Sequence, residues 1–240
     1  MRIKITISYD GTDFFGSQIQ PNKKTIHSEI LNTFKILNID TTIDFSGRTD
    51  KGVHAFRQVL SCNIPNYWNE LKKLKKQINN LLCDSIYVRD IRAVDDDFHS
   101  RFSAKKREYR YLITDKPTTP FNHRYITYYE NIDIDKINNA IKVFIGVYDF
   151  DMFCKKGSDP VSTIREIYDI KFYKFKDIYI LNFKANSYLR SQIRMMVDFI
   201  MKISQNKLTI DDLKNQLNKK KLVSWTLASS NGLYLSKIHY

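Results

Sequence analysis

A switch of hydrophobic period, repeated through the first half of the chain, constrains the fold most. Residues 2–9 alternate, with Ile3, Ile5 and Ile7 on one face, as in a half-buried strand. The period then becomes helical after Thr25, where apolar residues recur every three or four positions. The expected elements are, in order, a strand at 2–9, a helix after Thr25, strands at 43–45 and 56–62, a helix opened by Pro65, and a strand at 86–94. This β-α-β-β-α-β order is typical of a ferredoxin-like or split βαβ unit.

The second half of the chain repeats this outline without evident residue identity. Its expected elements are a strand at 107–114, a helix started by Asp133 or Asp135, strands at 163–174 and 178–185, a helix from Tyr188 to Ser204, a short helix capped by Thr209, and a strand at 233–240. No low-complexity linker separates the halves. We therefore expect an α+β fold of two ferredoxin-like or RRM-like halves, 1–103 and 104–240, that share one largely antiparallel mixed sheet.

The net charge of +13, from 39 Lys and Arg against 26 Asp and Glu, points to a polyanionic partner. Nucleic acid is the usual partner of this kind, although a surplus of solubilising lysine explains part of the charge. No apolar run approaches the roughly 20 residues of a membrane span, and the N-terminus is a strand rather than a signal peptide. The three cysteines are dispersed and have no histidine at ligand spacing. We expect a cytoplasmic protein with reduced thiols and no metal.

The candidate for chemistry is the loop at 46–55, SGRTDKGVHA, which joins two expected strands. Charged loops between strands often carry function, and glycines permit close backbone approach. In an extended chain Arg48 and Asp50 point the same way, and their contact would keep the carboxylate ionised. An ionised Asp can attack a sugar carbon or stabilise an oxocarbenium ion. On the loop alone, a solvated turn is an equal alternative.

Cations and aromatics interleave in residues 97–111, DFHSRFSAKKREYRY. Aromatic faces stack on unpaired bases while Lys and Arg contact phosphates, which favours RNA binding. In a strand, Tyr109 and Tyr111 share one face and Arg110 takes the other. The alternative is a sheet core in which tyrosine is a filler.

Two arginines further along the chain, Arg190 and Arg194, are four residues apart and would share one helix face. Arginine near a helix start favours a bound anion there, but a solvent-facing pair fits the spacing equally well.

Other catalytic designs are absent from the sequence. None of the seven glycines forms a phosphate-cradling loop, and there is no GxSxG elbow. The five histidines show no spacing typical of a catalytic pair, and we interpret His54 as a structural, backbone-bonded histidine. A carboxylate beside an arginine is the best catalytic candidate that remains.

These motifs together resemble the TruA family of tRNA pseudouridine synthases. The loop GRTDKGVHA at 47–55 is similar to the family's catalytic motif, and YDGTDFFG at 9–16 to its opening. FHSRFSA at 98–104 with YRY at 109–111 is similar to the middle motif. KAN at 184–186 with Ile193 and Arg194 matches the late helix, and GLYL at 232–235 matches the end. The motifs follow the family order across nearly the whole chain.

The resemblance implies a role for each matched residue. Asp50 is the catalytic aspartate, the nucleophile, which breaks the glycosidic bond of a target uridine by attacking the sugar or by assisting otherwise. Arg48 orients Asp50 and takes the place of the flipped base. Tyr109 packs on the uracil, and Arg194 pairs with the aspartate or a phosphate. Four further residues are expected on the RNA backbone, not from the resemblance but from the placement of the cations described above: Lys105, Lys106, Arg110 and Arg190.

The family also implies an activity, a partner and an assembly. We expect pseudouridine formation in tRNA at positions 38, 39 and 40 of the anticodon stem-loop, without a cofactor. The expected assembly is a homodimer, with two fused halves around a central basic cleft in each chain.

Three positions depart from the family pattern. Ser17 stands where Trp is usual, His27 where Gln is usual, and Lys51 where Ala is common; Lys51 has no assigned role. The alternative from another class is a non-catalytic RNA-binding protein on the same scaffold. A glycosidase acting on small sugars fails on the charge and on the lack of a second placed carboxylate.

Overall fold

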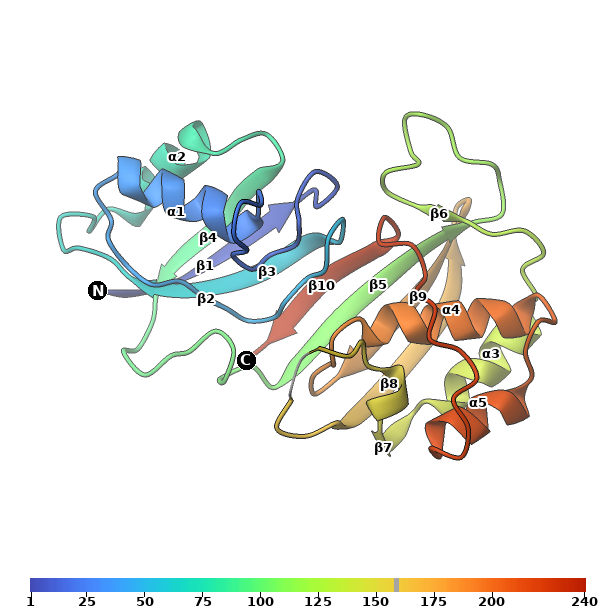
Figure 1. The fold of residues 1–240 in the computed structure, drawn as a ribbon. Coiled ribbons are helices and arrows are strands. Elements are labelled where there is room, and N and C mark those ends of the chain that lie inside the picture. The colour runs from blue at the N-terminus through green and yellow to red at the C-terminus, as the bar shows by residue number, and fades with distance from the viewer. Residues whose placement is uncertain (158–159) are drawn as a thin grey trace. The chain divides into compact units, whose positions relative to one another are not determined.

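The computed structural model describes residues 1–157 and 160–240. Within these residues the chain has ten strands, five α-helices and one short 3-10 helix (Figure 1). It divides into two compact units: unit 1 is Met1–Lys105 with Tyr234–Tyr240, and unit 2 is Lys106–Leu233. Most strand pairs are antiparallel. The predicted α+β class with largely antiparallel pairing is confirmed.

The sheet of unit 1 is built around β1, whose alternating isoleucines bury one face. Its strands are β1 (Arg2–Tyr9), β2 (Asp44–Phe45), β3 (His54–Asn63), β4 (Ile86–Ala93) and β10 (Leu233–His239). They pair in the order β4-β1-β3-β10, and β2 adds to β3. The loop that carries Asp50 therefore leaves one strand and enters another on the same sheet.

Two helices of unit 1, α1 (Ile26–Ile36) and α2 (Leu71–Leu81), contact each other beside the sheet (Figure 1). Helix α1 begins where the sequence predicts, because Thr25 and Ser28 form a capping box. Helix α2 begins later than the predicted Pro65. Trp68 lies before the helix and donates its indole N–H to the Leu37 carbonyl at 3.2 Å.

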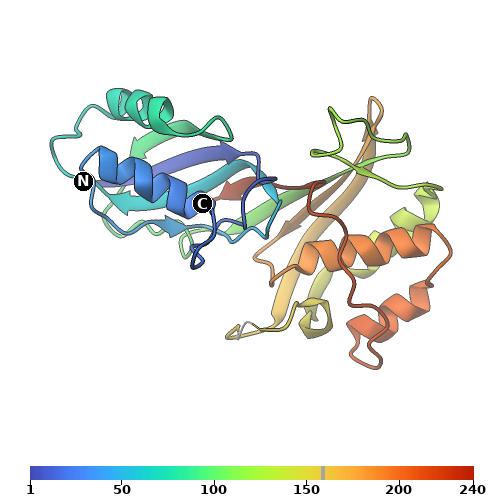
Figure 2. The ribbon, with the colours of Figure 1, turned by 45° about the horizontal axis from the view of Figure 1, so that its top comes forward.

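In unit 2 the strands pair in the order β5-β9-β8-β7, with β6 beside β5. They are β5 (Lys106–Thr114), β6 (Thr127–Tyr128), β7 (Gly146–Asp149), β8 (Ile164–Phe175) and β9 (Ile178–Ala185). The helices are α3 (Ile134–Val143), α4 (Gln192–Ser204) and α5 (Ile210–Leu217), with a 3-10 turn at Asp151–Phe153. Helix α3 packs on both α4 and α5 (Figure 2). Strands β6 and β7 were not predicted, since two and four residues are too short to show alternation.

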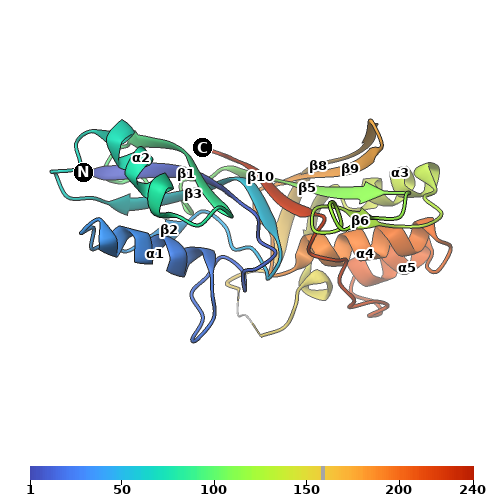
Figure 3. The ribbon, with the colours of Figure 1, turned by 90° about the horizontal axis from the view of Figure 1, so that it is seen from above.

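The last strand corrects the predicted division of the chain. The sequence assigned all of 104–240 to the second half, whereas residues 234–240 cluster with unit 1. The reason is that β10 runs parallel to β3, with Tyr234 opposite His54 and Leu235 opposite Ala55 (Figure 3). A non-local parallel pair of this kind leaves no signal in the local hydrophobic period.

Helix α4 starts at Gln192 rather than at the predicted Tyr188. Ser191 has a left-handed backbone (φ 59°), and the Gln192 side chain accepts the Leu189 N–H at 2.8 Å. These features hold the residues before Gln192 in a turn. Arg190 therefore lies outside the helix, and the expectation that it shares a helix face with Arg194 is wrong.

Candidate active site

The Asp50 loop follows β2 and leads directly into β3. Thr49 is buried, Asp50 is half-buried, and Arg48 and Lys51 are exposed. The Val53 N–H donates to the Asp50 carbonyl at 3.1 Å, and Gly52 supplies the positive φ (77°) inside this turn. The turn fixes the backbone just after Asp50.

The backbone just before Asp50 is fixed by Thr49. Its N–H donates to the Ser17 hydroxyl at 2.9 Å, and its carbonyl accepts the Ser17 N–H at 3.1 Å. Its own hydroxyl lies 2.9 Å from the Tyr9 hydroxyl. Burial raises the pKa of Tyr9 to about 12, against the opposing hydrogen bonds from Thr49 and Gln58. Tyr9 is therefore neutral at physiological pH, and every polar group of Thr49 has a partner.

Two glycines let the segment after β1 lie directly on this loop. A Cβ on Gly11 would stand 2.0 Å from the Val53 carbonyl oxygen, and one on Gly16 would stand 2.6 Å from the Thr49 carbonyl oxygen. No real side chain tolerates either approach. The segment at 9–16 and the Asp50 loop therefore pack directly against each other, and both glycines are needed for this contact.

The start of the loop is anchored by Gln58, a fully buried residue of β3. Its side-chain carbonyl accepts the Ser46 hydroxyl at 2.7 Å, and its amide donates to the Gly47 carbonyl at 2.8 Å. Neither Gln58 nor Ser17 was singled out as a site residue. Both are buried polar side chains whose hydrogen-bond partners lie in other segments of the chain, so the local sequence does not indicate their role.

His54 is buried at the start of β3. The Gly11 N–H donates to its Nδ1 at 3.1 Å, and an Asp10 carboxylate oxygen lies 3.1 Å from the same atom. The imidazole stacks on Tyr234 of β10 with ring centroids 4.7 Å apart. The predicted backbone hydrogen bond of His54 is confirmed, and its purely structural role stays a prediction.

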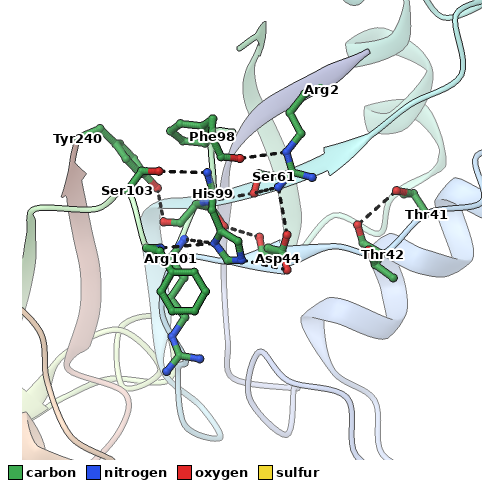
Figure 4. Close-up of polar contacts among 12 residues, drawn as sticks. Arg2, Thr41, Thr42, Asp44, Ser61, Phe98, His99, Arg101, Ser103 and Tyr240 are labelled. Atoms are coloured by element: carbon green, nitrogen blue, oxygen red, sulfur yellow. Dashed lines mark hydrogen bonds and ion pairs between the residues drawn. The ribbon is translucent and has the colours of Figure 1, made fainter. Parts of the chain in front are cut away.

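The middle motif forms a second ordered loop in unit 1, at residues 98–103 (Figure 4). The buried Ser100 anchors it, because its N–H donates to the Ser61 hydroxyl at 3.0 Å and its own hydroxyl donates to the Asp44 carbonyl at 2.7 Å. Arg2 adds an ion pair to the Asp44 carboxylate at 3.2 Å and a hydrogen bond to the Phe98 carbonyl at 3.0 Å (Figure 4). The loop is therefore tied to β1, β2 and β3.

This anchoring leaves two side chains of the same loop, Arg101 and Phe102, in solvent. The His99 Nδ1 accepts the Arg101 N–H at 3.1 Å, and its Nε2 lies 3.6 Å from Asp44 (Figure 4). Phe102 is 75% exposed, and the Arg101 guanidinium lies 5.4 Å from its ring centroid. A cation and an aromatic ring held together in solvent suit contact with an RNA base and its phosphate.

In unit 2, Tyr109 is buried on β5, and its ring meets Tyr188 edge-on at 5.3 Å. Arg110 points to the opposite face of the sheet, opposite Asn182 of β9. Arg194 lies in the first turn of α4, where its Nε donates to the Ala228 carbonyl at 2.7 Å. The predicted alternation of Tyr109 and Arg110 is confirmed.

The remaining expected site residues have separate surroundings. Arg48 is exposed, and within the described residues no ion pair joins it to Asp50, so its orienting role stays a prediction. Lys105 directly precedes β5 and Lys106 is its first residue, and both are exposed. Arg190 is exposed and donates to the carbonyls of residues 156 and 157. The Arg110 Nε is buried and has no hydrogen-bond partner among the residues that the structure describes.

Lys51, which had no assigned role, places its ammonium 4.4 Å from the Phe15 ring centroid. Lys23 approaches the same ring at 4.6 Å. Two cations therefore flank one aromatic ring next to the Asp50 loop.

Comparison with known proteins adds independent findings. A family model described as tRNA pseudouridine synthase matches residues 5–103 and 140–240. The tRNA pseudouridine synthase A of Campylobacter jejuni strain RM1221 is 41% identical over 240 residues, which cover 100% of both chains. The proteins of the same name from Wolinella succinogenes and Helicobacter pylori are each 35% identical, over 98% and 99% of this chain and 92% and 98% of theirs.

Among solved structures, a Cbf5-Nop10-Gar1 complex matches with a TM-score of 0.34 and 16% identity, over 80% of this chain and 43% of that chain. Among the described residues no helix is both long and apolar enough to span a membrane.

Proposed function

The chain belongs to the TruA family of tRNA pseudouridine synthases and is an isomerase of tRNA uridine, and from this premise we propose that it modifies positions 38, 39 and 40 of the anticodon stem-loop. The observation that carries the tRNA assignment is the match over the full length of a curated relative at 41% identity, whereas the three positions come from the family resemblance of the motifs. The net charge of +13 is consistent with tRNA as substrate. The non-catalytic RNA-binding alternative gains no support from the relatives, whose names are those of synthases.

In the proposed reaction, the bond from ribose C1′ to N1 of uracil is exchanged for a bond from C1′ to C5. N1 gains a proton and C5 loses one, so composition is unchanged and no cofactor is consumed. The Asp50 carboxylate is the group that acts on the sugar as the glycosidic bond breaks. Its support is the loop geometry: Asp50 is half-buried, and the backbone on both sides of it is fixed by hydrogen bonds.

Other residues take the roles that the family resemblance gives them. Arg48, exposed on the loop, fills the space left by the flipped uridine, and Tyr109 packs on the extruded uracil. Arg194 pairs with the aspartate or with a phosphate. Lys105, Lys106, Arg110 and Arg190, chosen for their charge and not from the resemblance, contact the RNA backbone.

The assembly and compartment belong to the same proposal. We expect a cytoplasmic homodimer in which tRNA contacts both subunits. Light scattering of the purified protein coupled to size-exclusion chromatography tests the dimer, and a monomer at micromolar concentration would contradict it.

The decisive experiment for the function replaces Asp50 by Asn. Pseudouridine in the anticodon arm, mapped by mass spectrometry, is expected to disappear, while tRNA affinity stays close to that of the wild type because the amide keeps the side-chain shape. Asp90→Asn is the matched control, since Asp90 is a half-buried β4 residue whose side chain is 43% exposed and pairs at the surface with Arg92. Normal product from the Asp50 variant would sink the assignment.

Substrates that carry a single uridine at position 38, 39 or 40 test the positions separately. Product from each is expected. Modification confined to another part of the tRNA would overturn the proposed positions while leaving the family assignment intact.

A further inference from the structure

Ser17 occupies a fully buried position between β1 and α1. Its carbonyl accepts the His27 N–H at 3.2 Å, in the first turn of α1, and the neighbouring Gly16 carbonyl accepts the Ile26 N–H at 3.2 Å. The backbone of Ser17 is thereby tied to the start of a capped helix. A side chain carried on such a rigid support has little freedom of its own.

From this support Ser17 contacts Thr49 at two points. Its hydroxyl accepts the Thr49 N–H at 2.9 Å, and its N–H donates to the Thr49 carbonyl at 3.1 Å. The carbonyl of Thr49 belongs to the peptide plane that continues into Asp50. Fixing that oxygen fixes the orientation of the plane from which the Asp50 side chain departs.

The chemistry of the contact calls for a short side chain with an acceptor. The Thr49 N–H is buried, and without the Ser17 hydroxyl it loses its partner. Gly16 lets the two backbones approach, since a Cβ there would meet the Thr49 oxygen at 2.6 Å. Between backbones this close, serine reaches Thr49 without displacing it.

We propose that Ser17 is a positioning residue for the reaction: through its two hydrogen bonds to Thr49 it holds the Asp50 carboxylate in its reactive orientation. The proposal rests on the proposed catalytic role of Asp50. It also gives a purpose to one departure of this chain from its family pattern. Ser17 itself touches no substrate.

The test is Ser17→Ala, assayed by single-turnover pseudouridine formation with enzyme in excess and by a separate tRNA binding measurement. The rate constant is expected to fall about tenfold or more, because small misplacements of a reacting group are costly, while the Kd for tRNA changes by less than about twofold. A loss in rate without a loss in binding separates positioning from a general loss of structure.

The matched control is Ser204→Ala. Ser204 is also a buried serine, and its hydroxyl accepts a backbone N–H, that of Asp133, at 2.8 Å, but it lies at the end of α4 in unit 2. Both variants lose the same kind of hydrogen bond, so their melting temperatures are expected to fall similarly. Only Ser17→Ala is expected to lose rate at a temperature where both are folded.

Ser17→Cys keeps the volume of the site in case the alanine variant does not fold. Sulfur accepts hydrogen bonds weakly, so this variant is expected to fold and still to lose rate. Full activity in a folded Ser17→Ala or Ser17→Cys protein would overturn the proposal, as would equal rate losses in Ser17→Ala and Ser204→Ala. Wild-type enzyme and Asp50→Asn are assayed in parallel. An inactive wild type would overturn both the proposed function and this inference. If the wild type is active, an unchanged rate in the Ser17 variants overturns only the proposed role of Ser17.

Discussion

At the scale of single residues, the site depends on buried polar groups that neighbouring sequence does not reveal. Asp50 and Arg48 stand out in the sequence because the motif surrounds them. Tyr9, Ser17 and Gln58 do not, because their partners lie in other segments. A buried hydroxyl or amide must find a partner, and the sequence alone does not say which one.

The Tyr9 hydroxyl gives the fold a specific alkaline limit. Burial raises the pKa of Tyr9 from 10.0 to about 12, so between these values the unfolded chain releases a proton that the folded chain keeps. Stability from this group is complete below pH 10 and is lost as the pH rises to about 12, by about 1.4 kcal/mol for each pH unit. Urea unfolding at a series of pH values is expected to show a shallower decline for Tyr9→Phe than for the wild type.

At neutral pH, where Tyr9 is protonated in both the folded and the unfolded chain, the variant is expected to be the less stable protein. Tyr9→Phe loses the contact with Thr49 and is expected to be less stable than the wild type by about 1 kcal/mol. The two curves should therefore converge as the pH rises. Parallel curves would mean that the Tyr9 phenol does not titrate in this window.

Tyr109→Phe tests whether the hydroxyl of that residue serves the reaction. The ring contact with Tyr188 is kept, so the fold and tRNA affinity should be preserved. Loss of one hydrogen bond in the reacting complex is expected to lower kcat by up to about tenfold. Tyr87→Phe, at an exposed position of β4, is the control. Equal losses in turnover and binding for Tyr109→Phe would indicate a structural role instead.

At the scale of elements, the sequence predicts the helices that begin at a capping motif. It does not predict helix starts that are decided by the backbone conformation of the folded chain. Helix α1 and the short helix α5 carry capping boxes at Thr25 and Thr209, and both begin as predicted. Helix α2 has no side-chain cap and begins at Leu71, later than the start predicted from Pro65. The start of α4 is set by the left-handed Ser191, which no propensity rule predicts for a serine.

The contact between the two glycine-bearing loops can be tested at Gly16. Gly16→Ala places a Cβ 2.6 Å from the Thr49 oxygen at a residue with φ of 91°. Gly157→Ala is a matched control, because its φ is 88° but the nearest atom among the described residues is a flexible Arg190 nitrogen at 3.5 Å. The control is expected to lose about 1–2 kcal/mol for the left-handed backbone alone. Gly16→Ala should lose more in thermal unfolding, and its activity should fall further; equal losses would show that the loops separate without cost.

At the scale of the whole molecule, the sequence predicts the fold class and the family. It does not predict that the last strand, β10, pairs with β3. The period changes along the chain predict an α+β protein, and the order of the motifs identifies the family. The return of β10 to β3, with Tyr234 stacked on His54 and Phe56, depends on residues far apart in the chain. Such pairings are decided by packing and not by local propensity.

The charge of the whole molecule makes a last prediction, about how tRNA binding depends on salt. Neutralising phosphates releases counterions, so with a net charge of +13 the tRNA affinity of Asp50→Asn is expected to fall by about a hundredfold or more between about 50 and 200 mM salt. Each lysine that contacts a phosphate should contribute about one unit to the slope of log Kd against log salt concentration.

Replacing Lys105 and Lys106 together by Ala is therefore expected to reduce this slope by about two. The control replaces Lys72 and Lys73, which are exposed on α2, and should leave the slope unchanged. Equal slopes for both double variants and the parent would place the RNA backbone away from β5. A smaller slope for the α2 variant alone would assign the lysine-rich helix to the tRNA interface, because only a cation that displaces counterions from the RNA alters the salt dependence.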